Sequence, residues 1–255
     1  MNQSGLHRTI VITGVSRGLG QAMVHEFVRL GHMVCGCART ECEITNLRRT
    51  YPAHDFEIVN VASNREVVSW ANHVISKHGA PMFVLNNAAV INIKAPLWTV
   101  DEHEVSDEID INIKGPINVI RHFVPAMIAA RRGVIVNFTS RWGQSIEKYM
   151  TAYCATKWAM VATSRALAEE LRKDRIAVVA LNPGIVNTAM LQRYLGRSES
   201  SPAYPRPDEW ARVSVPFILR LSLKDSGRVR KVCCKPASSN GTAHTARRCT
   251  YEERV

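Results

Sequence analysis

The stretch that decides the fold is Thr9-Ile10-Val11-Ile12-Thr13-Gly14-Val15-Ser16-Arg17-Gly18-Leu19-Gly20. It opens with β-branched residues, breaks at Gly14, and leads into Leu19–Leu30, where apolar residues recur at helical spacing. This pattern predicts a buried strand, a glycine turn and a helix. The glycines let the backbone approach a phosphate, and the first N–H groups of the helix point at it. The spacing G-x-x-x-G-x-G departs from the commoner G-x-G-x-x-G, but its place after the first strand favours a nucleotide site over a plain turn.

Apolar runs alternate with helical segments along most of the chain. Capping-box spacings open one helix at Ser63–Glu66 and another at Thr99–Glu102, which continues with interruptions near Gly115-Pro116 and Pro125 to about Ala130. Further helices are expected from about Thr151 to Lys173 and from Asp208 to Leu223. Strands after the first are expected at Met33–Ala38, Phe56–Val61, Met82–Leu85, Val134–Thr139 and Ile176–Leu181. The alternation predicts a single α/β domain, a doubly wound parallel sheet with helices on both faces.

Composition restricts the class of protein further. The 255 residues are 46% hydrophobic and 22% charged, which excludes a disordered or fibrous chain. The seven cysteines are an odd number without framework spacing, which fits a reducing compartment. Neither the short apolar run Ile10–Ile12 nor any other stretch is long enough for a signal peptide core or a bilayer span. We therefore expect a cytoplasmic protein without a membrane partner.

The basic charge is concentrated at the end of the chain. Thirty-three Lys and Arg against 22 Asp and Glu give +11, of which 228–255 carry +5 from seven basic and two acidic residues. The segment Cys233–Gly241 has no apolar period, so we expect a domain over 7–227 and a disordered basic tail over 228–255. That tail is either a genuine extension or a departure from the reading frame near Gly227. Without residues 228–255 the excess of positive charge is modest, and we expect no nucleic-acid partner.

Tyr153 and Lys157 lie four residues apart on a predicted helix, so they share one face. A phenol titrates near ~10, and an adjacent ammonium stabilises its anion, which makes tyrosine a usable proton donor near neutral pH. Such a pair is weak evidence alone, because many helix surfaces carry one.

Together with the glycine turn, the pair makes the chain resemble the short-chain dehydrogenase/reductase family, which has a Rossmann fold. Asn86-Asn87-Ala88-Ala89, Asn112, Ser140 and Pro183-Gly184 match in order, and the resemblance covers roughly 7–227. It implies that Tyr153 is the catalytic acid, that Lys157 lowers the pKa of Tyr153 and binds the nicotinamide ribose, that Ser140 polarises the substrate carbonyl, and that Asn112 holds a relay water. Ser140 precedes Tyr153 by thirteen positions, the usual family interval, which selects it over Ser145.

The predicted cofactor is NADP(H). The second strand ends Cys37-Ala38-Arg39, with no carboxylate for a ribose 2′-OH, whereas Arg17 and Arg39 offer guanidinium groups to a 2′-phosphate. Alternatively, both arginines are solvated surface groups. Ala89 and Asn60 depart from the Gly and Asp that are more common in the family. With the glycine turn, the resemblance implies a cofactor site made of Gly14, Ser16, Arg17, Gly18, Leu19, Gly20, Arg39, Asn60, Val61, Asn87, Ala88, Ala89, Tyr153, Lys157, Pro183, Gly184, Val186 and Thr188.

The substrate is less determined by the sequence. Trp142 and Tyr194 offer aromatic faces that could stack a planar ring or serve only in packing; with Ser140 and Tyr153 they are the predicted substrate residues. The segments Ser140–Gly143, 153–159, 180–184 and 208–211 are similar to the NADPH-dependent pterin aldehyde reductases of plants. This implies hydride transfer between NADP(H) and an aldehyde, ketone or alcohol, with a pterin-6-aldehyde as the favoured substrate. A different carbonyl substrate and a non-catalytic NADP-binding regulatory protein are the alternatives.

Two further expectations concern partners and metal. Relatives of this family assemble through the helix that bears Tyr153 and the long helix before it, so the resemblance implies a homodimer or homotetramer. We expect no metal site, because Cys35 and Cys37 fall on one face of a buried strand and the nine histidines show no H-x-x-x-H spacing.

Overall fold

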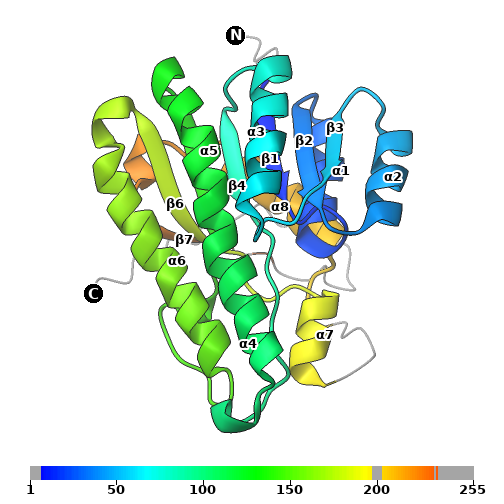
Figure 1. Cartoon of the computed structure of the whole chain (residues 1–255), viewed down its shortest axis with the longest axis vertical. Coiled ribbons are helices and arrows are strands. Elements are labelled where there is room, and N and C mark those ends of the chain that lie inside the picture. Colours follow the sequence, from blue (N-terminus) through cyan, green and yellow to red (C-terminus); the bar gives the residue numbers. More distant parts are fainter. Residues whose placement is uncertain (1–6, 197–202, 233, 235–255) are drawn as a thin grey trace, which may run out of the picture.

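The computed structural model describes residues 7–196, 203–232 and 234. In these ranges the strands form one parallel sheet in the order β3-β2-β1-β4-β5-β6-β7 (Figure 1). The strands are β1 (Thr9–Thr13), β2 (Met33–Ala38), β3 (Asp55–Ile58), β4 (Phe83–Asn86), β5 (Gly133–Phe138), β6 (Ile176–Asn182) and β7 (Val229–Lys231). The α-helices are α1 (Gly18–Arg29), α2 (Glu41–Thr50), α3 (Asn64–His78), α4 (Glu102–Ile109), α5 (Gly115–Ala130), α6 (Thr151–Glu170), α7 (Ala189–Leu195) and α8 (Pro207–Ile218). The predicted doubly wound parallel sheet is confirmed.

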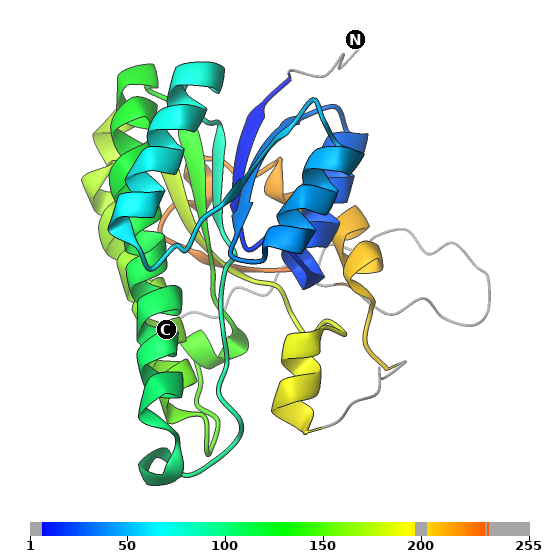
Figure 2. The same cartoon turned by 45° about the vertical axis from the view of Figure 1, so that its right-hand side comes forward.

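Helices cover both faces of the sheet, which is why its central strands are apolar throughout rather than alternating. One core lies between the sheet and α1, α2 and α8, with Phe27 and Trp210 at its centre. The other lies under α3, α5 and α6 and contains Trp70 against Phe123, with ring centroids 5.2 Å apart. Figure 2 shows the two helical layers on either side of the sheet. None of the helices in the described ranges is long and apolar enough to cross a bilayer.

The strand order reverses between β1 and β4, which are neighbours although β2 and β3 intervene in the chain. At such a switch point the connections leave toward opposite sides and open a crevice outside the carboxyl ends of the strands. In Figure 1, α4 and α7 extend beyond this edge of the sheet. The fold therefore places the turns after β1, β4, β5 and β6 around one space.

The third strand and the second helix differ from the prediction. The third strand is Asp55–Ile58 rather than 56–61, so Asn60 and Val61 lie beyond it, where they can line the crevice. The helix α2 was not predicted, because it buries only Ile44 and Leu47 and its remaining residues are polar.

The domain also extends past the predicted boundary at Gly227. Residues Val229–Lys231 form β7, which pairs with β6, and Val232 is buried in the core beside α8. Arg230 is accommodated on this edge strand because its guanidinium lies over the Phe217 ring and pairs with Asp225. The prediction that the tail begins at residue 228 is therefore wrong. Residues 235–255 lie outside the described part.

The long helical region from Glu102 to Ala130 is nearly continuous. Instead of breaking at Gly115-Pro116, it passes through one π-helical turn, Asp110–Lys114, and Pro125 lies inside α5. A π turn contains one residue more than an α turn, so it changes the rotation between the segments on either side, and such turns are frequent at functional sites. Asn112 lies in the middle of this turn.

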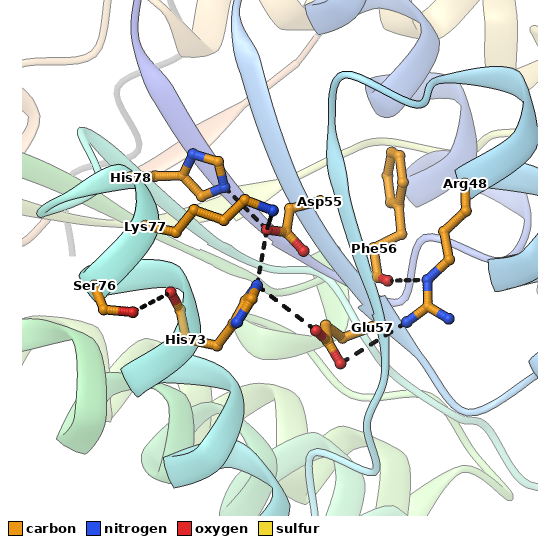
Figure 3. Close-up of polar contacts among 8 residues, drawn as sticks. All are labelled: Arg48, Asp55, Phe56, Glu57, His73, Ser76, Lys77 and His78. Carbon is orange, nitrogen blue, oxygen red and sulfur yellow. Dashed lines mark hydrogen bonds and ion pairs between the residues drawn. The ribbon is translucent and has the colours of Figure 1, made fainter.

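The edge strand β3 is held to α3 through one buried carboxylate, shown in Figure 3. Asp55 Oδ2 accepts hydrogen bonds from Lys77 Nζ at 3.1 Å and His78 Nε2 at 2.9 Å, and it lies 3.1 Å from His73 Nε2. Burial raises the pKa of Asp55, but the hydrogen bonds outweigh burial and hold the pKa below its ordinary value. Asp55, Glu57 and His73 are close enough together to share a cation, yet Asp55 Oδ2 already accepts hydrogen bonds from Lys77 and His78.

We expect Asp55→Asn to lower the free energy of unfolding by about 2 kcal/mol at neutral pH, because charge-assisted hydrogen bonds are lost. The folded-state pKa of Asp55 lies below its unfolded value of 3.8, so this contribution is complete above that value and disappears as the pH falls through the folded-state pKa. Urea titrations at neutral and at strongly acidic pH measure it. The matched control is Glu57→Gln, whose contacts with His73 and Arg48 are long at 3.9 Å. An equal loss of unfolding free energy in both variants would show that the hydrogen bonds of Asp55 do not stabilise the fold as stated.

Candidate functional site

A cavity of about 830 Å³ lies at the carboxyl edge of the sheet. It runs from the ends of β2 and β3, past the glycine turn, to a region bounded by α4, α6 and α7. A cavity of this size and elongation can hold a dinucleotide and part of a small substrate. Of the predicted site residues it is lined by Gly14, Ser16, Arg17, Gly18, Leu19, Arg39, Asn60, Val61, Asn87, Ala88, Ala89, Tyr153, Lys157, Pro183 and Thr188.

The glycine turn is packed against the segment after β4. Gly14 has φ +74°, and a Cβ there would lie 2.8 Å from the Ala88 Cα; at Gly20 it would lie 2.0 Å from the Gly14 carbonyl oxygen. Asn87 Nδ2 donates to the carbonyl oxygens of Thr13 and Gly14, which fixes the turn. Asn87 thus acts on the turn itself, which sequence reasoning did not predict. Gly20 lies behind the turn and does not line the cavity.

The start of α1 fits an anionic group. Arg17, the residue before the helix, makes no side-chain capping hydrogen bond, so its side chain leaves the first-turn N–H groups uncapped. Around Gly18, which has φ +60°, a Cβ would meet nothing nearer than Thr188 Cγ2 at 3.7 Å, so the space beside the helix terminus is open. Uncapped N–H groups facing an open cavity are what a pyrophosphate requires, so these residues fit the predicted dinucleotide.

The two predicted phosphate-binding arginines lie at one end of the cavity. Arg17 and Arg39 are both exposed, and among the described residues neither has an ion-pair partner. Glu43, which was not predicted, is the carboxylate that lines the same end. The two guanidinium groups leave a positive excess there, consistent with a phosphate ligand.

Tyr153 and Lys157 are buried side by side at the other end, 6% and 3% exposed. Lys157 Nζ lies 5.3 Å from the centroid of the Tyr153 ring and donates to the Phe138 carbonyl oxygen at 3.1 Å. Burial lowers the pKa of Lys157 to about 8, which the Glu108 carboxylate opposes. Burial also raises the pKa of the Tyr153 phenol, and Glu108 adds to the increase. Lys157 is not among the groups that shift the pKa of Tyr153, so the expected lowering by Lys157 does not occur in this arrangement, where the Lys157 ammonium contacts the ring and the Phe138 carbonyl.

Asn112 and Ser140 support the site without lining the cavity. The Asn112 side chain accepts from the Val90 N–H at 2.8 Å and donates to the Val90 carbonyl and to Thr156 Oγ1, so it joins the segment after β4 to α6. The Ser140 hydroxyl accepts from the Trp142 N–H at 3.3 Å. Gly184 and Val186 also lie off the cavity wall, and Val186 is buried in the core.

The predicted aromatic residues come together next to Tyr153. The Trp142 ring meets Tyr153 edge-on with centroids 5.8 Å apart and lies 4.9 Å from Tyr194. The Tyr194 hydroxyl donates to Glu147 Oε1, which also accepts from Lys94. Trp142 and Tyr194 pack against a small apolar cluster that contains Ile91, Met150 and Tyr153, of which Ile91 and Tyr153 line the cavity. The cluster supports the catalytic end of the cavity, and neither Trp142 nor Tyr194 is on its lining.

Sequence reasoning missed the acidic residues on α4. Glu104, Asp107 and Glu108 all line the cavity, and Arg193 of α7 pairs with Glu104. A helical repeat of acidic residues is typical of a solvated face, so no sequence signal distinguished Glu108, which is 1% exposed.

Comparisons with known proteins agree with this geometry. The family model "short chain dehydrogenase" matches residues 8–197. The chain is 41% identical over 223 residues to an NADPH-dependent pterin aldehyde reductase of Arabidopsis thaliana, which spans 86% of this chain and 91% of the relative. It is 30% identical over 187 residues to a 3-oxoacyl-[acyl-carrier-protein] reductase of Pseudomonas aeruginosa, across 72% and 75% of the two chains. A metagenomic short-chain oxidoreductase solved in complex with NADP superposes with a TM-score of 0.72 at 28% identity, across 91% and 98% of the two chains.

Proposed function

Because the chain belongs to the short-chain dehydrogenase family, we propose that it is an NADPH-dependent reductase that converts an aldehyde to an alcohol, with a pterin-6-aldehyde as its substrate. The observation that carries this proposal is the burial of Tyr153 beside Lys157 in the same cavity as the glycine turn. The relative from Arabidopsis thaliana supports both the cofactor and the substrate class.

Four side chains have a part in the proposed reaction. NADPH supplies the hydride. Tyr153 donates its phenolic proton to the carbonyl oxygen, and the raised pKa of Tyr153 keeps the phenol protonated before the transfer. Lys157, with a pKa of about 8, returns a proton to the phenolate. The family resemblance gives Ser140 the polarisation of the carbonyl and Asn112 the relay water, although neither side chain lines the cavity and the Asn112 amide is bonded to Val90 and Thr156.

The same proposal gives the cofactor an orientation along the cavity. Gly14, Ser16, Gly18 and Leu19 hold its pyrophosphate, and Arg17 and Arg39 hold the 2′-phosphate at the far end. Asn60 and Val61, which follow β3, contact the adenine, and Pro183 and Thr188, which follow β6, lie against the nicotinamide end.

We also propose that the protein is a cytoplasmic homodimer or homotetramer. Exposed apolar side chains on α4 to α6 support this assembly: Ile109 is 42% exposed, Ile117 38% and Trp158 47%. Size-exclusion chromatography with light scattering measures the mass directly. A monomer at micromolar concentration would contradict the assembly.

The test of the proposed activity is the loss of NADPH absorbance with pterin-6-aldehyde and with 4-nitrobenzaldehyde. We expect turnover with both and a higher kcat/KM for the pterin. Saturable NADPH binding without turnover of either aldehyde would instead favour a non-catalytic NADP-binding protein.

A further inference from the structure

Glu108 is a buried carboxyl group that the proposed hydride and proton transfers do not use. It lies on α4, is 1% exposed, and lines the cavity that also holds Tyr153 and Lys157. Its Oε1 accepts a hydrogen bond from the Asn92 N–H at 2.6 Å. Its Oε2 is buried and has no hydrogen-bond partner among the described residues. A buried carboxylate oxygen without a partner is costly, so it points to a group from outside the chain.

Charged groups from three helices face Glu108. Burial raises its pKa to about 7, and Glu104 of the same helix adds to the increase, whereas the Asn92 N–H, Lys157 of α6 and Arg193 of α7 oppose it. Tyr153 and Cys154 of α6 also interact electrostatically with Glu108. Near neutral pH a substantial fraction of Glu108 is ionised, and an ionised Oε2 only accepts hydrogen bonds.

The chemistry of this end of the cavity restricts what can bind there. Glu104, Asp107 and Glu108 line it from α4, and Glu104 is already paired with Arg193. A carboxylate on a ligand would face like charges, whereas a neutral N–H group would satisfy the free oxygen.

We propose that Glu108 is a specificity-determining residue whose Oε2 accepts a hydrogen bond from an N–H donor of the substrate. The enzyme then prefers carbonyl compounds that carry a lactam, amide or aromatic amine over those that carry none. This inference rests on the proposed reductase function, and it identifies the part of the substrate that the site recognises away from the reacting carbonyl.

A purely structural role of Glu108 explains the contact of Oε1 but not the buried, unpartnered Oε2. The Oε1 contact with the Asn92 N–H holds the segment after β4, and a glutamine oxygen would make the same contact. In Glu108→Gln that contact is retained, while the second oxygen becomes an amide NH2, which donates. The substitution therefore replaces an acceptor by a donor at nearly constant volume, and an N–H group of the substrate then meets another donor.

The experiment compares the wild type with Glu108→Gln and with Glu102→Gln. Glu102 is exposed on the same helix and lies off the cavity, so Glu102→Gln removes one carboxylate charge away from the substrate. The first measurement is kcat/KM for pterin-6-aldehyde, which has N–H donors, and for 4-nitrobenzaldehyde, which has none. The second is the Kd of 6-hydroxymethylpterin in the presence of NADP⁺, from pterin fluorescence, which needs no turnover.

We expect Glu108→Gln to lower kcat/KM for pterin-6-aldehyde by about tenfold or more, because a site built for a hydrogen bond rejects a mismatched group. The Kd of 6-hydroxymethylpterin should rise by a similar factor. The loss of kcat/KM with 4-nitrobenzaldehyde should be several-fold smaller, because it reflects only the changed charge beside Tyr153 and Lys157, and Glu102→Gln should match the wild type throughout. Equal losses for both aldehydes, an unchanged pterin Kd, or no measurable pterin binding by the wild type would overturn the inference. Inactivity of the wild type with both aldehydes, combined with a weakened pterin Kd in Glu108→Gln, would overturn the proposed function alone.

Discussion

Tyr153→Phe should reduce the rate of NADPH-dependent aldehyde reduction by about 1,000-fold or more, because it removes the group that protonates the carbonyl oxygen. The ring contacts with Trp142 and with Lys157 Nζ involve the aromatic ring, so phenylalanine retains them. Within the described part of the chain, the Tyr153 hydroxyl makes only a long contact with Met190 Sδ at 3.9 Å, so the fold should lose little stability. Steady-state turnover and NADPH fluorescence titration together measure the effect.

The matched control for this substitution is Tyr51→Phe. It removes one phenolic oxygen at the end of α2, where the hydroxyl contacts the exposed His25 and lies off the cavity. Its turnover should equal that of the wild type. A Tyr153→Phe enzyme that keeps the wild-type rate would remove Tyr153 from the mechanism, and loss of NADPH binding would show that the variant acts through the cofactor site.

The second large effect concerns the choice of cofactor. Replacing both Arg17 and Arg39 by alanine should reduce kcat/KM for NADPH by about 100-fold or more, because each charge-assisted hydrogen bond contributes about 1.5–3 kcal/mol. The value for NADH, which lacks the 2′-phosphate, should change little. Removal of both guanidinium groups also leaves Glu43 as the charged group at that end of the cavity, which disfavours a phosphate further.

Parallel kinetics with NADPH and NADH measure this preference, and Arg65→Ala is the control. Arg65 is exposed on α3 and lies off the cavity, so its loss changes the net charge equally. A wild-type enzyme that uses NADH as well as NADPH would contradict the assignment of Arg17 and Arg39.

The parts of the fold that the sequence predicted are those with strong local patterns. The strand, glycine turn and first helix lie within Thr9–Arg29. The strand is a continuous buried apolar run, and the helix repeats buried residues at helical spacing. The helix α2 escaped prediction because two buried residues do not make a period. The strand β7 escaped because it is short, lies at an edge and carries Arg230 and Lys231, whose charges are typical of a polar tail.

The candidate site was predictable where a motif is contiguous. Tyr153 and Lys157 meet because four residues span one helical turn, and the glycine turn is a single loop. Glu108 and Arg193 were not predictable, because only tertiary packing brings α4 and α7 to the cavity. The pKa of Tyr153 was misjudged for the same reason, since the sequence gives the distance between two residues but not the burial of either.

The π turn at Asp110–Lys114 makes the length of one segment as important as its residues. Each residue of a helix turns the chain by about 100°, so removing one residue there would rotate α4 by that angle relative to α5. The apolar face of α5 would stay on the sheet, while Glu108 would turn away from the cavity. The number of residues in the π turn thus helps to set which substrates the pocket accepts. Insertions or deletions in this turn would change that preference while Tyr153 and Lys157 stay in place.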